Sequence, residues 1–113
     1  MFEDFKLKVF KAVAECHSFT LAARQLGISQ PAVSQNISDL ERMSGTQLFV
    51  RAKGEVSLTP AGRLFESLAD RVIQSYEDLN SVFSDYEHFD EIVEKAQELK
   101  DDPRFRVIKD LYL

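Results

Sequence analysis

Between residues 18 and 43 the apolar positions follow the period of an α-helix in two short runs. A first helix is expected over residues 21–26, closed by Gly27, and a second starts at Ser29. Gly27 can adopt the left-handed conformation that ends a helix, and Ser29 can cap the next helix with its hydroxyl. The pattern therefore predicts two helices joined by a tight turn.

The second helix of this pair has an uncharged outward face. Its apolar positions, expected to face the core, are Val33, Ile37 and Leu40. The outward positions carry hydrogen-bonding side chains instead of the usual Lys and Glu: Gln30, Ser34, Gln35 and Ser38. Such side chains can read base edges in a major groove. A helix pair with a Gly turn also occurs in domains that bind no nucleic acid, so the pattern alone leaves both interpretations open.

A further helix is expected before this pair, over residues 4–16. Its core face carries Leu7, Phe10, Val13 and Ala14, and its solvated side carries Lys6, Lys8 and Lys11. Thr20 is the expected N-cap of the following helix. His17 lies in the corner between the two helices. Because it has no Cys or His partner at metal-ligand spacing, it is not expected to bind a metal.

Short extended runs follow the helix pair. Residues 47–50 and 56–58 are expected to form two strands joined by residues 51–55. A β-hairpin behind a helix-turn-helix is a wing, and its tip can lie along the DNA backbone or in the minor groove, where Arg and Lys are favoured. Arg51 and Lys53 are candidates for such contacts. Arg51 can instead pair with an acidic residue near the base of the wing.

A long helix is expected over residues 60–88, because a hydroxyl cap, Thr59, precedes a proline at the first helical position. Two series of apolar residues then recur every seven positions: Phe65, Val72, Leu79 and Tyr86, and between them Ala69, Tyr76 and Phe83. This spacing is typical of a helix that pairs with another helix. The helix is too long to bury such a stripe against the small domain before it, so the expected partner is the same helix of a second subunit. Packing onto the chain's own tail is the alternative.

Composition and charge narrow the class of protein. The chain has 113 residues, of which 44% are hydrophobic, and nine are Phe, which is enough for one folded domain with an appended helix. No membrane span or signal-peptide pattern is visible, so we expect a cytoplasmic protein. The net charge is −5. Residues 1–63 hold eight basic and six acidic residues, net +2, whereas residues 64–113 hold six and thirteen, net −7. The basic excess therefore lies in the half with the helix pair.

The motifs together resemble those of a known family. They are Phe10, Ala14-Glu15, Ser18-Phe19-Thr20, Ala22-Ala23, Leu26-Gly27, Ser29-Gln30-Pro31-Ala32-Val33-Ser34, Leu40-Glu41, Gly45, Leu48-Phe49, Arg51 and Leu58-Thr59-Pro60-Ala61-Gly62. Over roughly residues 5–88 the chain resembles the N-terminal DNA-binding domain of LysR-type transcriptional regulators. The resemblance implies a mainly α fold, in which a winged helix-turn-helix of three helices and a two-stranded β wing precedes a long dimerisation helix and a short helical tail.

Two positions depart from the pattern of the family that the chain resembles. Asp39 stands where the family often has a basic residue, and the acidic Glu55 follows the wing turn. Both residues are expected to weaken contact with phosphates.

Three segments are expected. They are a winged helix-turn-helix over residues 1–59, the linker helix over 60–88, and an acidic helical tail of unassigned role over 89–113. Full-length members of the family continue into a large effector-binding domain. The tail has no room for an inducer pocket, so no small-molecule ligand is expected. We interpret the chain as a stand-alone short member, and the alternative is that it is part of a longer regulator.

The predicted function is that of a sequence-specific DNA-binding transcriptional regulator, which binds a partly palindromic site of double-stranded DNA as a homodimer. The candidates for base contacts are Gln30, Pro31, Ser34 and Gln35. The candidates for backbone and wing contacts are Thr20, Ser29, Ser38, Arg51 and Lys53. The expected dimer interface consists of Phe65, Ala69, Val72, Tyr76, Leu79, Phe83 and Tyr86.

Other function classes receive less support from the sequence. No Gly-rich phosphate loop, Cys/His cluster or nucleophile elbow is present in it, so no enzyme activity, cofactor or metal is expected. A protein-interaction role is the rival hypothesis. In that role the chain forms a heterodimer with a full-length relative and blocks the DNA binding of that relative.

Overall fold

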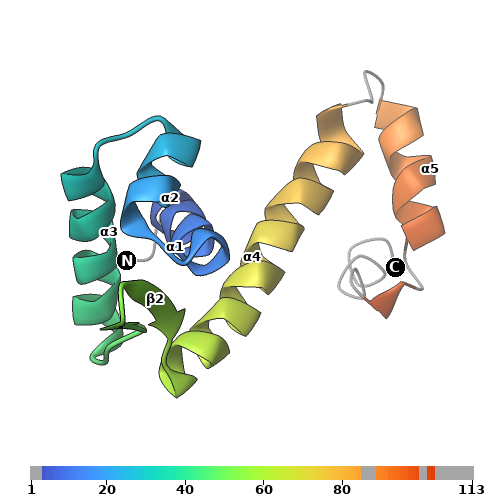
Figure 1. Ribbon diagram of the computed structural model, residues 1–113. Coiled ribbons are helices and arrows are strands. Elements are labelled where there is room, and N and C mark those ends of the chain that lie inside the picture. The colour runs from blue at the N-terminus through green and yellow to red at the C-terminus, as the bar shows by residue number, and fades with distance from the viewer. Residues whose placement is uncertain (1–3, 85–88, 100–101, 104–113) are drawn as a thin grey trace. The chain divides into compact units, whose positions relative to one another are not determined.

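The computed structural model describes residues 4–84, 89–99 and 102–103 (Figure 1). In chain order it contains α1 (Asp4–Cys16), α2 (Phe19–Leu26), α3 (Gln30–Ser44), β1 (Phe49–Ala52), β2 (Glu55–Leu58), α4 (Pro60–Ser84) and α5 (Phe89–Leu99). The chain divides into two compact units, Met1–Ile73 and Gln74–Leu113, so α4 contributes to both. The predicted mainly α fold is confirmed: three helices and a two-stranded wing precede a long helix and a short one.

The helix α1 forms the centre of the first unit, because it packs against α2, α3 and β2. The predicted core residues of α1 are all buried, and Val9 and Ala12 are buried beside them. The ring of Phe10 is fully buried and lies 5.1 Å from the ring centre of Phe49 and 4.7 Å from that of Phe65. These aromatic contacts join α1 to the wing and to the first part of α4.

The start of α2 differs from the prediction. The helix begins at Phe19, and Ser18 is the N-cap, with its hydroxyl accepting a hydrogen bond from the Leu21 N–H at 3.1 Å. Thr20 therefore lies within the first turn and is not the cap. The physical reason is the burial of Phe19, which places that residue on the apolar face of the helix together with Ala22. A helix that starts at Phe19 turns both side chains toward the core, and Ser18, the residue directly before it, is the cap.

The start of α3 confirms the local signals in the sequence. The Ser29 hydroxyl caps the helix by accepting from the Ala32 N–H at 3.2 Å, and Pro31 lies in the first turn. The predicted core residues of α3 are fully buried: Val33, Ile37 and Leu40. Gly27 has a φ of 69° and ends α2 in the left-handed conformation, as expected. The turn therefore fixes α3 across α2, with its polar face outward.

The wing is a tighter hairpin than predicted. Antiparallel pairing runs from Phe49 opposite Leu58 to Ala52 opposite Glu55, so the strands extend further toward the tip than expected. Only Lys53 and Gly54 remain as the turn, with φ angles of 55° and 77°. A two-residue turn with two positive φ angles matches the twist of paired strands, which explains why the connection is so short. Lys53 consequently occupies the tip of the wing.

Helix α4 is fixed against the base of the wing. Thr59 is the predicted cap, and its hydroxyl accepts from the Gly62 N–H at 2.9 Å and donates to the Gln47 carbonyl at 2.7 Å. The Thr59 N–H donates to the Leu48 carbonyl at 3.0 Å. Gly62 lies directly against that same carbonyl, where a Cβ atom would overlap the oxygen. The backbones of α4 and of the residues before β1 are therefore in direct contact.

An ion-pair cluster also ties α4 to α1. Lys11 Nζ lies 3.0 Å from a carboxylate oxygen of Asp70, 3.6 Å from Glu66 and 3.8 Å from Glu15. The hydrogen bond to Asp70 is the main cause that raises the pKa of Lys11. Lys11 is thus a partner of three carboxylates rather than a solvated surface residue.

The exposed apolar face of α4 differs in part from the predicted stripe. Phe65 packs on the core beside Phe10, and Ala69 is only 4% exposed, so both lie inside the first unit. The exposed positions are instead six apolar residues of 44–64% exposure: Leu64, Leu68, Val72, Tyr76, Leu79 and Phe83. Heptad spacing alone does not reveal that the first turns of α4 are covered by their own domain. Tyr86 lies outside the described residues.

The tail contains α5, which confirms the expected helix in this segment. Ala96 of this helix is buried, and its apolar residues Ile92, Val93 and Leu99 are half-buried. The last part of the expected tail, residues 104–113, lies outside the described residues. In the part of the chain that the structure describes, no helix is long and apolar enough to cross a membrane.

Candidate nucleic-acid interface

The outward face of α3 presents the polar side chains that the sequence singles out. Gln30 and Pro31 are exposed in the first turn, and Gln35 is exposed one turn later. Ser38 is exposed, and Ser34 is half-buried because it borders the wing. The four candidates for base contacts and Ser38 therefore lie on one helix, on the side away from the core residues.

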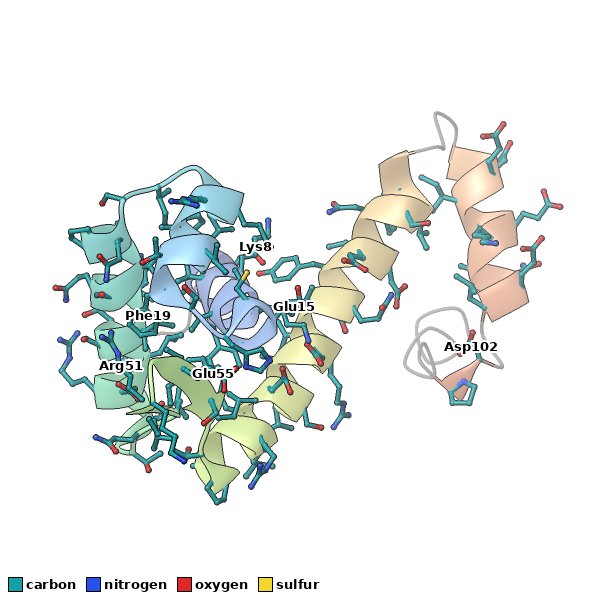
Figure 2. The ribbon with its side chains drawn as sticks, in the orientation of Figure 1. Lys8, Glu15, Phe19, Arg51, Glu55 and Asp102 are labelled. Carbon is teal, nitrogen blue, oxygen red and sulfur yellow. The ribbon has the colours of Figure 1, made fainter. Side chains whose placement is uncertain are left out.

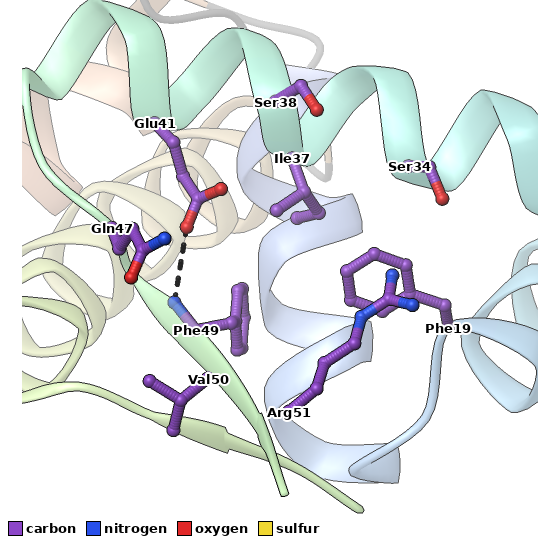
Figure 3. Close-up of a pocket in the computed structure, with 9 residues that line it drawn as sticks. All are labelled: Phe19, Ser34, Ile37, Ser38, Glu41, Gln47, Phe49, Val50 and Arg51. Carbon is purple, nitrogen blue, oxygen red and sulfur yellow. Dashed lines mark hydrogen bonds between the residues drawn. The ribbon is translucent and has the colours of Figure 1, made fainter. Parts of the chain in front are cut away.

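A hollow of about 470 Å³ lies between α3 and the wing (Figure 3). Its lining combines polar and apolar groups: Phe19 from α2, Ser34, Ile37, Ser38 and Glu41 from α3, and Gln47, Phe49, Val50 and Arg51 from the wing side. Glu41 fixes one wall, because its Oε2 accepts from the Leu48 N–H at 2.7 Å and the Phe49 N–H at 3.3 Å. The distance between α3 and β1 is thus set by direct hydrogen bonds.

Arg51 is one of the residues that line this hollow, and its side chain lies beside Phe19 (Figures 2 and 3). The carbon of its guanidinium group is 4.2 Å from the ring centre, which is a cation–π contact. Within the described residues no ion pair joins Arg51 to an acidic group, so the alternative of an acidic partner at the wing base is not what the structure shows. Stacking engages the face of the guanidinium group and leaves its N–H edge available to an anion.

The remaining backbone candidates lie at the N-termini of helices or at the wing tip. Thr20 is exposed in the first turn of α2, and Ser29 is the exposed cap of α3. The free N–H groups at such helix ends favour anions such as phosphate. Lys53 is exposed at the tip of the wing. These residues border the α3 face on two sides.

The negative charge of Asp39 is compensated by Lys6, a residue of α1 that the sequence pattern predicts on the solvated side of that helix. Lys6 Nζ lies 3.0 Å from Asp39 Oδ2, and the two side chains are 17% and 18% exposed. The hydrogen bond from Lys6, assisted by one from Gln35, holds the pKa of Asp39 below its ordinary value. The negative charge at this unusual position is therefore neutralised locally.

Acid should weaken the fold through Asp39. Because its pKa is lowered by folding, the contribution of Asp39 to stability is present above the ordinary pKa of 3.8 and is lost as the pH falls through the folded value. We expect the melting temperature of the wild type to fall more steeply than that of Asp39→Asn on going from about pH 5 to about pH 2. Thermal melts across this pH range measure the fall in melting temperature. Glu55→Gln, which removes an exposed carboxylate, is the control. Parallel profiles for wild type and Asp39→Asn would contradict the role of the pair.

His17 connects the helical corner to the wing, a role that the sequence did not indicate. Its carbonyl accepts from the Val56 N–H at 3.3 Å, and its Nδ1 lies 3.1 Å from the Val56 carbonyl. His17 itself has a φ of 54° and follows the last turn of α1. No local signal predicts this contact, because it depends on where β2 lies in the folded chain. Within the described residues, no group of three potential metal ligands is found.

Known proteins share both the sequence and the fold of this region. The family model described as "Bacterial regulatory helix-turn-helix protein, lysR family" matches residues 5–63. The uncharacterised HTH-type transcriptional regulator YcgK of Bacillus subtilis (strain 168) is 46% identical over 77 residues, which are 67% of this chain and 24% of YcgK. The HTH-type transcriptional regulator BudR of Raoultella terrigena is 54% identical over 59 residues, which are 52% of this chain and 20% of BudR. The chain thus spans about a quarter or less of the length of these relatives.

Solved structures similar to this chain include complexes with DNA. In the complex of BenM_DBD with catB site 1 DNA, the protein chain is 36% identical with a TM-score of 0.70, over 74% of this chain and 93% of that chain. In the CbnR_DBD–DNA complex, the protein chain is 32% identical with a TM-score of 0.67, over 71% of this chain and 92% of that chain. Sequence and fold lead to the same assignment: the chain belongs to the lysR family of bacterial regulatory helix-turn-helix proteins.

Proposed function

We propose that the chain is a transcriptional regulator that binds double-stranded DNA sequence-specifically, with α3 in the major groove and the wing along the neighbouring backbone. The observation that carries the proposal is the uncharged hydrogen-bonding face of α3 beside a wing that presents Arg51 and Lys53. The DNA complexes of BenM_DBD and CbnR_DBD, whose folds are similar, support binding to DNA. The names of the relatives as transcriptional regulators favour a binding function over catalysis.

The contacts divide into two groups by chemistry. Gln30 and Gln35 can hydrogen-bond base edges, and Pro31 can touch a thymine methyl group. Ser34 can reach either a base or a phosphate. The phosphate contacts come from Thr20, Ser29, Ser38, Arg51 and Lys53. Phosphate contacts fix the position of the protein, whereas base contacts supply the sequence preference.

We further propose that the protein acts as a homodimer through α4. The exposed apolar positions Val72, Tyr76, Leu79 and Phe83 belong to the predicted interface, and Leu64 and Leu68 extend it toward the start of the helix. Six exposed apolar residues along one helix favour an interaction site there. A two-fold dimer presents two copies of α3 to a partly palindromic site. A function on DNA also favours a cytoplasmic location.

A dimer would also compensate for the small positive charge of a single DNA-binding domain. Residues 1–63 carry eight basic and six acidic residues, a net charge of only +2. Two domains on one duplex double the number of phosphate contacts, and each contact adds about 0.9 to the slope of log affinity against log salt. The salt dependence of binding therefore counts the phosphates that the dimer engages.

Gln30→Ala tests the assignment of α3 as the reading helix. Loss of one good base contact should lower affinity for the preferred duplex by about 1–3 kcal/mol, or roughly 5- to 150-fold, with little change for a scrambled duplex. Fluorescence anisotropy with both duplexes across a salt series measures it. Gln97→Ala, at an exposed position of α5, is the control. Equal losses on both duplexes would remove Gln30 from the base contacts, and wild-type binding without sequence preference would overturn the proposed function.

A further inference from the structure

Asp39 holds the side chain of Gln35 in one orientation. Gln35 Nε2 donates to Asp39 Oδ1 at 2.9 Å, across one turn of α3. Asp39 is itself held from the other side, because its Oδ2 accepts from Lys6 Nζ at 3.0 Å. Arg42 adds a nitrogen 3.2 Å from Oδ1. One carboxylate thus receives three donors, and Gln35 is the exposed uncharged one among them.

The position of the carboxylate is set by packing between α1 and α3. Lys6 Nζ donates to Asn36 Oδ1 at 3.0 Å as well as to Asp39, and Asn36 Nδ2 donates to the Ala32 carbonyl at 2.8 Å. The Lys6 and Asp39 side chains are both more than four-fifths buried, since they are 17% and 18% exposed. Partly buried charges are screened less by salt than exposed ones. The pair is therefore a stable anchor for Gln35.

The chemistry of a carboxylate decides which end of the Gln35 amide faces it. An ionised carboxylate only accepts hydrogen bonds, and an amide offers NH₂ donors at one end and an acceptor oxygen at the other. The end that faces Asp39 is therefore the NH₂ group. The oxygen Oε1 is directed away from the carboxylate, on an exposed side chain of the polar α3 face.

We propose that Asp39 orients Gln35 so that its Oε1 accepts a hydrogen bond from the exocyclic amino group of a base in the major groove. This inference rests on the proposed function and names the class of base that α3 reads. Adenine presents its N6 amino group and cytosine its N4 amino group in this groove, whereas guanine and thymine present the acceptors O6 and O4. Gln35 thus selects amino bases over keto bases, and Asp39 is the positioning residue.

Base analogues without the amino group test this selection on the wild-type chain. The preferred duplex is first selected from a random pool, and each adenine is then replaced by purine or each cytosine by 2-pyrimidinone. We expect at least one position in each half-site at which the replacement lowers affinity about 5- to 150-fold, the range for one good base contact. The position read by Gln35 is the one at which Gln35→Ala removes this loss. The analogue that produces the loss shows whether the amino group belongs to adenine or to cytosine.

Asp39→Asn should relax the selection at that position. An Asn side chain offers both a donor and an acceptor, so Gln35 can turn either end of its amide toward the base. Discrimination by amino group should fall to within about twofold, while the loss of a negative charge raises affinity for all duplexes alike. Adding Gln35→Glu to Asp39→Asn should restore the preference, because a carboxylate at position 35 is again an acceptor only.

The chain supplies a matched control. Gln74 Nε2 donates to Asp78 Oδ1 at 3.1 Å, the same pair of residue types at the same spacing on α4. Asp78→Asn should leave the discrimination unchanged. Gln35→Ala, at an exposed position, should abolish it even if Asp39→Asn does not fold. Retained discrimination in Gln35→Ala or in folded Asp39→Asn would overturn the inference, as would a sequence-specific wild type with no amino-dependent position. A wild type without any sequence preference would instead overturn the proposed function, and the inference with it.

Discussion

Leu79→Glu is expected to lower the affinity for a duplex with two half-sites by about 10²- to 10⁴-fold, the range by which joining two binding modules exceeds one module alone. Leu79 is 54% exposed and belongs to the apolar face of α4. A Glu in a paired apolar surface is buried without a partner, which disfavours the dimer. Each subunit then binds its half-site as an independent molecule.

Two measurements on Leu79→Glu separate dimerisation from folding. Sedimentation should show a dimer for the wild type and a monomer for the variant, and affinity for a single half-site should change little. Ser81→Glu introduces the same charge at an exposed position on the other side of α4 and should leave both properties intact. A Leu79→Glu variant that remains dimeric would contradict the proposed interface.

Gly62→Ala is expected to destabilise the first unit by about 3 kcal/mol or more, the upper range for overpacking, and to lower its melting temperature by more than about 10 °C. Gly62 lies in the first turn of α4 without a positive φ, so helix propensity alone predicts that Ala would stabilise it by about 1 kcal/mol. The added Cβ would overlap the Leu48 carbonyl oxygen and lie 3.0 Å from a methyl group of Leu58. Because the overlapped atom belongs to the backbone, a side-chain rotation cannot relieve it.

The sign of this effect is what distinguishes the close backbone contact from ordinary helix propensity. Denaturant unfolding of the wild type and of Gly62→Ala measures the change in the free energy of unfolding. Ser67→Ala, at an exposed position of the same helix, should change stability by no more than about 0.5 kcal/mol. Stabilisation by Gly62→Ala would show that α4 can move away from Leu48 at little cost.

The sequence predicts most of the fold because its signals are local. Ser29 and Gly27 act within one turn of chain, and their roles in the structure match the prediction. Ser18 and Thr20 are both good caps, and only the burial of Phe19 decides between them. The sequence does not indicate the short wing turn, because Lys53 is an unusual residue for a positive φ.

The parts that the sequence could not predict depend on contacts between distant segments. Phe65 fits the heptad series, but its place beside Phe10 is known only once α4 is packed on α1. Lys6 and Asp39 are thirty-three positions apart, and neither residue alone indicates that one neutralises the other. The candidates for base contacts were found because they share one helix face, and their individual roles remain predictions.

The tie between His17 and Val56 has a consequence for the DNA itself. Both backbone groups of Val56 are held by His17, and Glu41 accepts from the Phe49 N–H at the start of the other strand, so hydrogen bonds fix both strands of the wing to the helices. With these hydrogen bonds in place, we expect that the wing and α3 cannot adjust separately to a duplex of unsuitable shape. We expect the duplex to bend or change its groove width instead, at an energy cost that depends on its base steps. Base pairs that no side chain touches would then contribute to specificity through their stiffness.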